Sequence, residues 1–430
     1  MNNVWALLYI DPGTGSMLFT IIVGLVSTLV FAFRGQLLKL KFLFTGGKGD
    51  KADKNKLPYV IFTDSKRYWN VFKPICDEFE RREIEVNYYT ASPDDPALSE
   101  DYEFVKAKFI GEGNKAYAKM NMLNSTICLS TTPGLDVLQW KRSKDTDFYV
   151  HTYHDVTEGL GYRMFGVDFY DAVLLTGEFQ EEYIRILEEK RDFPVKELFV
   201  TGSTYMDGLL KQYEAIKDNN DINQDRPFTV LLAPSWGTDS ILNKYGERIL
   251  KALVDTGYKI VVRPHPQSFI SDADLMKSLQ EKFPDNDMFS WNSDNDNFKV
   301  MYESDIMITD FSGIIFDYTF IFDRPLIYAD THMDKAPYDA SWVEGEVWKL
   351  RILPELGQKL EESDFSRMKE IIDGVSDNEI FKQGREKYRN IAWQCKGNSA
   401  KLTVDYLENK YKELTDKERD VEYEPDQATV

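Results

Sequence analysis

The chain has 430 residues and a formal net charge of −20, with 43% hydrophobic and 29% charged residues. This length predicts two or three domains, and the acidity argues against general nucleic-acid binding, which requires a basic surface. The three cysteines are widely spaced, so we expect neither a disulfide framework nor a cysteine metal site, and we favour a reducing compartment.

The first 44 residues are predicted to be a membrane anchor. An uncharged apolar stretch predicts a helix over about residues 16–33, at the short end of the roughly 20 residues that cross a bilayer. Basic residues follow this stretch from Arg34 onward, whereas Asp11 precedes it, so the positive-inside rule places the rest of the chain in the cytoplasm. A re-entrant hairpin made with residues 4–10 and a buried helix of the soluble part are the alternatives.

A polar linker, residues 45–56, leads into a first soluble domain that we place at residues 57–220. In this domain short apolar runs alternate with segments of helical pattern, which predicts a parallel sheet covered on both faces. The predicted strands are 59–63, 84–90, 107–110, 125–130, 148–152, 172–176 and 198–200, and the predicted helices are 66–82, 114–123 and 180–190.

A polar break at residues 218–227 precedes a second block of the same kind, residues 227–395. Its predicted strands are 228–233, 259–262, 288–291, 304–309 and 326–328, and its predicted helices are 243–256, 272–282, 314–322, 364–374 and 379–395. A final helix over 396–415 and a charged, disordered tail over 416–430 are expected to complete the chain. The fold class is therefore α/β, with two Rossmann-like domains.

Four polar turns follow predicted strands, at residues 151–155, 235–237, 263–266 and 310–313. Ligands of open α/β sheets bind at the carboxyl ends of strands, and three of the four histidines lie in these turns. His154, next to Asp155, is a candidate general base. A structural role in a polar turn is the alternative for His154, and we assign such a role to His151.

The turn Arg263-Pro264-His265-Pro266 holds a histidine between two prolines, which fix the backbone on either side of it. Arg263 is a cation suited to a phosphate or a carboxylate. The imidazole of His265 is therefore aimed rather than mobile. A capping histidine in a rigid turn is the alternative interpretation.

Residues 304–330 read as strand, polar turn, helix and strand, and the start of that helix could bind an anion such as a diphosphate. Thr309 and Ser312 are candidate donors to an anionic oxygen, and N-capping by Asp310 or Ser312 is a compatible role. Asp317 is either a ligand to a sugar hydroxyl or a partner of Arg324. The candidate donor-binding residues are Arg263, Thr309, Asp310, Ser312, Gly313, Asp317 and Ser235.

Over about residues 145–395 the chain resembles the CDP-glycerol glycerophosphotransferase family, the teichoic acid polymerases and primases of bacterial cell walls. The resemblance rests on six stretches of sequence. They are LLAPSW at 231–236, RPHP at 263–266, SDIMITDFSGIIFDY at 304–318, DRPLIYA at 323–329, YHD at 153–155 and TGSTYMDGL at 201–209.

The resemblance implies a GT-B arrangement, in which two Rossmann-like domains face a cleft and the C-terminal one binds the nucleotide donor. His154 matches the family's presumed base, and His265 matches the histidine thought to assist at the donor phosphate. Ser312 matches the first serine of the family's diphosphate turn, Gly313 stands where the second serine is usual, and Asp317 matches the aspartate of its FDY stretch.

The function we expect is transfer of glycerol phosphate or ribitol phosphate from a CDP-linked donor to a hydroxyl of a membrane-associated glycan or lipid-linked acceptor. No cofactor and no metal held by protein ligands are expected, and the oligomeric state stays open. A GT-B glycosyltransferase with a nucleotide-sugar donor is the alternative. A membrane-tethered scaffold that has lost turnover is a third hypothesis, motivated by Gly313 and Asp155.

Overall fold

The computed structural model describes residues 56–217, 226–294, 296–329, 333–375 and 378–422. The predicted anchor helix over 16–33 and all but the last residue of the predicted linker lie outside these ranges. Within them, no helix is both long enough and apolar enough to cross a membrane. The placement of the chain at a membrane therefore stays a prediction from the sequence.

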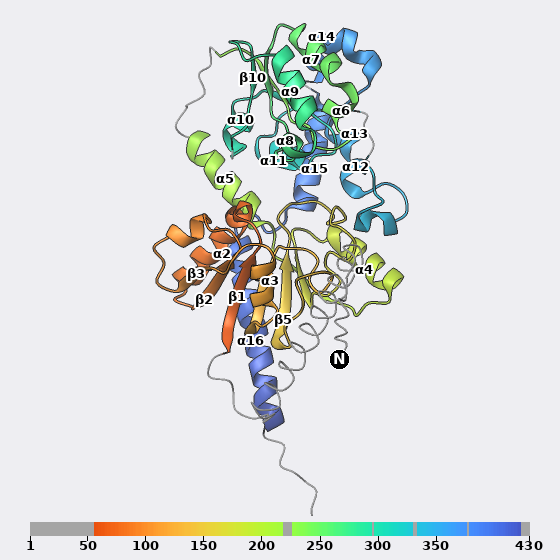
Figure 1. Ribbon diagram of the computed structural model, residues 1–430. Helices are drawn as coiled ribbons and strands as arrows, with labels where there is room; N and C mark the ends of the chain where they lie inside the picture. The colour runs from red at the N-terminus through yellow and green to blue at the C-terminus, as the bar shows by residue number, and fades with distance from the viewer. Residues whose placement is uncertain (1–55, 218–225, 295, 330–332, 376–377, 423–430) are drawn as a thin grey trace, which may run out of the picture. The chain divides into compact units, whose positions relative to one another are not determined.

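Residues 56–217 form an N-terminal lobe built on a seven-stranded parallel sheet of order β3-β2-β1-β4-β5-β6-β7 (Figure 1). The strands are β1 (Leu57–Thr63), β2 (Val86–Thr90), β3 (Val105–Phe109), β4 (Asn124–Ser130), β5 (Asp145–Thr152), β6 (Ala172–Leu175) and β7 (Glu197–Val200). Alternate residues of β1 serve two different cores, because Ile61 packs with Phe72 on one face while Phe62 packs with Trp140 on the other. Both faces of this sheet are therefore covered, as the sequence predicts.

The C-terminal lobe, residues 226–392, repeats this plan with six parallel strands in the order β10-β9-β8-β11-β12-β13. The strands are β8 (Thr229–Leu232), β9 (Lys259–Val262), β10 (Phe289–Trp291), β11 (Ile306–Thr309), β12 (Leu326–Ala329) and β13 (Gln358–Leu360). Leu231 and Leu232 of β8 are both fully buried but belong to different cores. The central strands of this lobe are thus apolar on both faces.

Most of the longer helices that cover the two sheets agree with the sequence predictions. In the N-terminal lobe they are η1 (Lys66–Tyr68), α2 (Trp69–Arg81), η2 (Pro96–Ser99), α3 (Asn114–Met120), α4 (Phe179–Arg191) and α5 (Thr204–Lys217). In the C-terminal lobe they are α6 (Ile241–Tyr245), α7 (Glu247–Val254), α8 (Ser268–Ser271), α9 (Ala273–Lys282), α10 (Phe298–Tyr302), α11 (Ile314–Ile321), η3 (Asp339–Trp342), α12 (Trp348–Arg351), α13 (Leu353–Leu356), η4 (Glu362–Arg367), α14 (Met368–Val375) and α15 (Glu379–Ala392).

One predicted helix needs correction, and several helices were not predicted. The predicted helix over 243–256 is two helices, α6 and α7, because Gly246 between them has a φ of 48°, which interrupts a right-handed helix. Helix α5 was not predicted, although its buried residues include Met206 and Leu209. The short elements η3, α12 and α13 were also missed, since each is only four residues long and too short to show a period.

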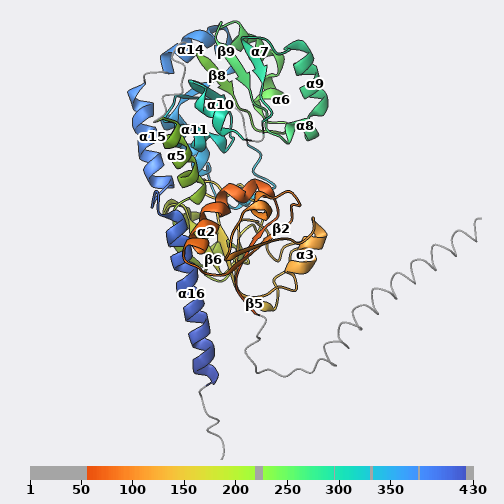
Figure 2. The same cartoon turned by 90° about the vertical axis from the view of Figure 1, so that its left-hand side faces the viewer.

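The last helix, α16 (Ser399–Glu422), returns to the N-terminal lobe and packs beside α2 and β4 (Figure 2). Val404 and Leu407 are buried in the core that contains Tyr59, and the rings of Tyr59 and Tyr411 lie 5.1 Å apart. The helix is longer than the predicted 396–415, and it includes residues 416–422 of the stretch that we expected to be disordered. Its length is consistent with the absence of glycine and proline from residues 399–422.

A segment that follows β12 docks onto residues that follow β5, and we call residues 338–349 the strap. The backbone N–H groups of Asp339 and Ala340 donate to the carbonyls of Tyr162 (2.9 Å) and Leu160 (3.0 Å). Arg191 of α4 bonds Asp168 at 2.8 Å and Asp339 at 2.6 Å, and all three side chains are at most 3% exposed. A buried ion cluster therefore fixes the C-terminal strap to the N-terminal lobe.

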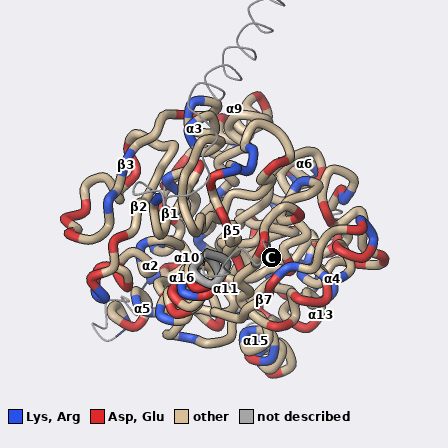
Figure 3. The backbone as a smooth tube through the Cα atoms, turned by 90° about the horizontal axis from the view of Figure 1, so that it is seen from below, with Lys and Arg blue, Asp and Glu red and all other residues tan. Residues whose placement is uncertain are grey.

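Acidic and basic positions are interspersed over the described residues on the side of the molecule seen in Figure 3. This mixture accords with the acidic composition of the chain. On this side the charge pattern therefore resembles an ordinary solvated surface rather than the basic stripe typical of nucleic-acid binding.

Candidate active site

The structure places the predicted polar turns directly after strands. His154 and Asp155 follow β5, Ser235 follows β8, and Arg263 follows β9. Phe311 to Gly313 follow β11 and lead into α11. Because all of these strands run parallel within their sheets, each turn lies at a carboxyl end, where open α/β sheets bind ligands.

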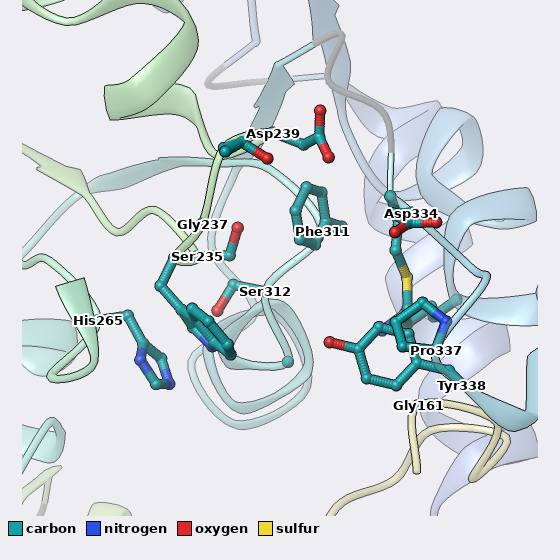
Figure 4. A pocket seen from close by; sticks show the side chains of 15 residues that line it. Gly161, Ser235, Gly237, Asp239, His265, Phe311, Ser312, Asp334, Pro337 and Tyr338 are labelled. Atoms are coloured by element: carbon teal, nitrogen blue, oxygen red, sulfur yellow. The ribbon is translucent and has the colours of Figure 1, made fainter. Parts of the chain in front are cut away.

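A pocket of about 420 Å³ lies at the start of α11 (Figure 4). It contains four of the predicted site residues, Ser235, His265, Ser312 and Gly313. The other lining residues are Gly161, Trp236, Gly237, Thr238, Asp239, Phe311, Met333, Asp334, Pro337, Tyr338 and Lys349. We call this space the donor pocket, after the donor-binding residues that the sequence predicts there.

Asp310 does not line the donor pocket but holds a loop that does. Its buried carboxylate accepts hydrogen bonds from the backbone N–H groups of Ser235 (2.9 Å) and Ile241 (3.0 Å). Burial raises the pKa of Asp310, and these hydrogen bonds oppose the rise. Asp310 therefore holds the loop that carries Ser235 and Gly237, a positioning role rather than the direct donor contact that we expected.

Thr309 is also turned away from the pocket. Its buried hydroxyl donates to the carbonyl of Ala233 at 2.6 Å, and the residue is not among those that line the donor pocket. This hydrogen bond thus joins the end of β11 to the end of β8. This corrects the expectation that Thr309 donates to an anion.

The two residues before α11 are well placed for an anion. Ser312 and Gly313 line the pocket, and Gly313 has an ordinary helical conformation with φ −64° and ψ −20°. The first N–H groups of a helix have no partner within the helix and carry its positive end. The N–H groups of Ile315 and Phe316 already donate to the carbonyls of Ser312 (3.4 Å) and Gly313 (3.2 Å), so a phosphate oxygen at the start of α11 would meet the N–H groups that precede them.

His265 faces the same pocket and has a defined hydrogen-bonding role. Its Nδ1 accepts a hydrogen bond from the backbone N–H of Gln267 at 3.1 Å, so the neutral ring carries its proton on Nε2. Burial lowers the pKa of His265, and the positive charge of Arg67 lowers it further. His265 is therefore a neutral donor near pH 7.

Arg263 lies on the other side of this turn. Its guanidinium donates to the side-chain oxygen of Asn292 and to the carbonyl of Asp294, the latter at 2.9 Å. It lines a second cavity and is not among the donor-pocket residues. The expected contact between Arg263 and the diphosphate is thus not supported by this arrangement.

His154 is held by hydroxyl groups in a wall of aromatic rings. Its Nδ1 lies 3.3 Å from the hydroxyl of Thr131 and 3.3 Å from that of Tyr162. Tyr162 in turn lies 3.1 Å from Nε2 of buried His151, and the ring of Tyr68 lies 4.8 Å from the His154 ring. Burial lowers the pKa of His154, Asp155 opposes this, and Arg67 adds to it. Because both hydroxyl partners are at Nδ1, they orient the ring, and Nε2 is the nitrogen that could accept a proton.

Asp317 is half-buried, and its hydrogen-bond partner differs from the two that we expected. It accepts a hydrogen bond from the hydroxyl of Tyr205 at 2.9 Å, whereas Arg324 donates to backbone carbonyls such as that of Tyr302 (2.7 Å). Burial raises the pKa of Asp317 to about 7, and the charge of Asp155 raises it as well. Asp317 is not among the donor-pocket residues. It therefore joins α11 to α5.

Replacing Asp317 by asparagine should stabilise the protein relative to wild type more strongly as the pH rises. The folded state keeps the Asp317 proton up to about pH 7, whereas the ordinary pKa of an aspartate is 3.8. The carboxyl therefore costs stability progressively between these values. Urea denaturation from pH 5 to 8 measures this difference. The free energy of unfolding of Asp317→Asn minus that of wild type should rise by on the order of 1 kcal/mol per pH unit up to about pH 7 and then level off. A difference that is the same at every pH contradicts this.

Two cations near the site were missed by sequence reasoning. Lys349, on the strap, lines the donor pocket, and its Nζ lies 3.9 Å from where a Cβ of Gly161 would be. Its backbone N–H donates to the buried carboxylate of Glu158 at 3.1 Å. Arg67 precedes α2 and influences both histidines electrostatically. Neither residue is in a motif, and only the fold brings them to the site.

Two parallel sheets of Rossmann order, with polar turns at their carboxyl ends, define a GT-B-like α/β fold. A sequence model of the family described as CDP-Glycerol:Poly(glycerophosphate) glycerophosphotransferase matches residues 115–347. The chain belongs to this family and is a CDP-glycerol glycerophosphotransferase-like enzyme.

Solved structures share the fold. The wall teichoic acid polymerase TagF, in a variant soaked with CDPG, is 17% identical, with a TM-score of 0.55 over 90% of this chain and 99% of that one. UDP-GlcNAc 2-epimerase from Neisseria meningitidis, bound to UDP-GlcNAc, is 12% identical, with a TM-score of 0.50 over 82% of this chain and 100% of that one. A search of curated proteins found no match.

Proposed function

We propose that this chain transfers glycerol phosphate or ribitol phosphate from a CDP-linked donor to a hydroxyl of a membrane-associated glycan or lipid-linked acceptor, in the synthesis of a teichoic-acid-like polymer. The observation that carries the proposal is the donor pocket. This chain belongs to the family, and its pocket of about 420 Å³ is lined by the start of α11, by His265 and by Lys349. The neutral ring of His265 carries its proton on Nε2.

The donor diphosphate would lie against residues 311–313. There the N–H groups at the helix start and the Ser312 hydroxyl can donate to phosphate oxygens. His265 would add its Nε2–H, and Lys349 would balance the negative charge that gathers on the leaving phosphate. Tyr338, whose hydroxyl points into the pocket from the opposite wall (Figure 4), would close this side of the site.

His154 would act as the base. With its proton on Nδ1, shared with Thr131 or Tyr162, the ring has a lone pair on Nε2. The acceptor hydroxyl would attack the β-phosphorus and give its proton to Nε2. The bond from that phosphorus to the oxygen shared with the α-phosphate would break, and CMP would leave with this oxygen.

The anchor prediction supports a membrane location for the reaction. An apolar segment at 16–33 with basic residues after it would place the catalytic part in the cytoplasm, where nucleotide donors are made, and next to a lipid-linked acceptor. Fractionation of cells that express the full chain, with and without residues 1–44, tests this. Full-length protein that stays with the soluble fraction would contradict it.

A donor screen tests the proposed reaction. Purified full-length protein is incubated with CDP-glycerol, CDP-ribitol or a UDP-sugar, together with a lipid-linked acceptor, and the released nucleotide is identified. We expect CMP from at least one CDP-alditol. Release of UDP from the UDP-sugar, with no CMP from either CDP-alditol, would favour an ordinary glycosyltransferase.

Serine at position 313 should be tolerated, although glycine there motivated the hypothesis of a non-catalytic scaffold. A Cβ added to Gly313 meets no atom within 4 Å, and its φ of −64° suits any residue. Gly313→Ser should therefore change CMP release by no more than about twofold, the effect of an unstrained surface substitution.

The matched control is Gly237→Ser in the same pocket, where φ is 90°. A serine there would be strained, so the donor KM should rise in this variant and not in Gly313→Ser. Loss of CMP release in Gly313→Ser alone would show that the glycine is required.

A further inference from the structure

Three hydrogen-bonded side chains lead from the proposed base into the core of the N-terminal lobe. Nδ1 of His154 lies 3.3 Å from the hydroxyl oxygen of Tyr162, and the same oxygen lies 3.1 Å from Nε2 of His151. His151 is fully buried on β5, whereas His154 and Tyr162 belong to the segment that follows this strand. We call these three side chains the His–Tyr–His triad.

The middle member of the triad, Tyr162, is held in place from several sides. Its ring stacks on that of Tyr153, with ring centres 5.8 Å apart and an angle of 18° between the ring planes. A Cβ added to Gly166 would lie 2.6 Å from the Cβ of Tyr162, so the glycine leaves room for this side chain. The Tyr162 carbonyl also accepts the backbone N–H of Asp339, in the strap, at 2.9 Å. Packing therefore keeps the phenol oxygen between the two imidazoles.

The protons available to the triad limit which group donates to which. Burial raises the pKa of Tyr162 well above its usual value, and the charge of Asp155 raises it as well, so the phenol keeps its proton. Burial lowers the pKa of His151 to about 3, and the charge of His154 lowers it too, so His151 is neutral and has one nitrogen that accepts. Because a hydroxyl has a single proton, Tyr162 can donate to one imidazole while it accepts from the other.

Two arrangements satisfy both hydrogen bonds. In the first, Tyr162 donates to Nε2 of His151 and accepts from Nδ1–H of His154, which leaves a lone pair on Nε2 of His154. In the second, both directions are reversed, and Nε2 of His154 carries the proton and cannot act as a base. The two arrangements therefore differ in whether His154 is ready to react.

The surroundings of His151 favour the first arrangement, in which its proton is on Nδ1. This nitrogen is buried and has no hydrogen-bond partner among the described residues. The rings of Tyr153 and Tyr170 pack against the imidazole, with ring centres 5.2 and 4.9 Å away. The face of an aromatic ring is negative, so it attracts an N–H and repels a lone pair.

Thr131 acts in the opposite direction. Its buried hydroxyl lies 3.3 Å from the same Nδ1 of His154. Within the described part of the chain, this hydroxyl has no second hydrogen-bond partner to take its proton. On its own, Thr131 would therefore donate to Nδ1 and leave the proton of His154 on Nε2. The outcome depends on Tyr162, whose proton has another acceptor in His151.

We infer that Tyr162, backed by buried His151, is a positioning residue that keeps the proton of His154 on Nδ1 and so leaves Nε2 free to take the acceptor proton. This inference rests on the proposed function, in which His154 is the base. Neither Tyr162 nor His151 lines the donor pocket, so both act through His154. Catalytic bases are commonly oriented by a third group, and here that group is a neutral phenol.

Nitrogen-15 NMR of the full-length protein reads the tautomer directly. The chain has four histidines, and the spectrum of His154→Gln identifies the signals of His154. At pH 8 we expect the proton of His154 on Nδ1 in wild type and on Nε2 in Tyr162→Phe, where Thr131 is the remaining partner. The matched control is Tyr170→Phe, which removes the hydroxyl of another buried tyrosine, one that donates to the carbonyl of Thr132 at 2.6 Å. This control should leave the tautomer as in wild type.

The kinetic test uses the same two tyrosine variants together with His151→Leu. Tyr162→Phe should lower kcat for CMP release about 10²-fold or more, because a base in the wrong tautomer cannot accept the proton, and the donor KM should not change. His151→Leu leaves the phenol without its acceptor and should have a similar effect, and the double variant should be no worse than either single one. Tyr170→Phe should keep kcat close to that of wild type.

The NMR measurement needs no turnover, so it separates this inference from the proposed reaction. If wild-type protein releases no CMP but the tautomer changes in Tyr162→Phe and not in Tyr170→Phe, the inference stands and only the proposed function is refuted. Wild-type His154 with its proton on Nε2, a tautomer that Tyr162→Phe leaves unchanged, or an equal loss of kcat in the two tyrosine variants would overturn the inference.

Discussion

Replacing His154 by glutamine should lower kcat for CMP release by about 10²–10⁴-fold, the contribution of a positioned general base. Glutamine keeps hydrogen-bonding groups near Thr131 and Tyr162, which hold the imidazole at 3.3 Å, but it cannot accept a proton at neutral pH. Because His154 is not among the residues that line the donor pocket, stabilisation of the variant by CMP in thermal unfolding should match that of wild type.

The pH profile gives an independent check on the same residue. A base must be neutral to act, and burial lowers the pKa of His154 below its ordinary 6.5. The kcat/KM of the wild type should therefore be flat around neutrality and fall on the acid side only below pH 6.5. A variant with more than about a tenth of wild-type kcat, or an acid limb centred well above pH 6.5, would argue against His154 as the base.

Replacing Asp339 by alanine should lower the free energy of unfolding by about 3–5 kcal/mol, the cost of leaving one member of a buried ion cluster without its partner. The guanidinium of Arg191 is 2% exposed and would keep only Asp168. The backbone N–H groups of Phe165 and Gly166, which donate to Asp339 at 2.9 and 3.1 Å, would lose their acceptor too.

The same substitution should also weaken donor binding, because Pro337 and Tyr338 line the donor pocket just before Asp339. Chemical denaturation and the donor KM measure the two effects. The control is Lys251→Gln, which breaks an ion pair whose side chains are 70% and 61% exposed, and such pairs add little stability. If Asp339→Ala is as stable as this control, the strap is not held by the ion cluster.

The sequence predicted the framework well because its signals are local. Buried parallel strands such as β6 and β8 are short apolar runs between turns, and the polar residues after them mark the carboxyl edge of each sheet. The break in the helix at Gly246 depends on one backbone angle, and the strap depends on contacts with residues more than 100 positions earlier. Neither leaves a periodic pattern in the sequence.

The candidate site was predicted in part, for a related reason. Sequence locates a turn but not the direction of each side chain in it, so Ser312 and His265 face the donor pocket while Thr309 and Arg263 point elsewhere. Lys349 could not have been found, since it reaches the pocket only through the strap. Arg67 lies in the turn after β1, and it would have been a candidate if every strand end had been treated alike.

The identity of the released nucleotide tests phosphate transfer most directly. Full-length protein is given CDP-glycerol and an acceptor that ends in a free hydroxyl, and the products are followed by phosphorus NMR. Attack at the β-phosphorus predicts CMP together with a new phosphodiester on the acceptor. Release of CDP, with glycerol joined to the acceptor and no new phosphodiester, would contradict alditol phosphate transfer.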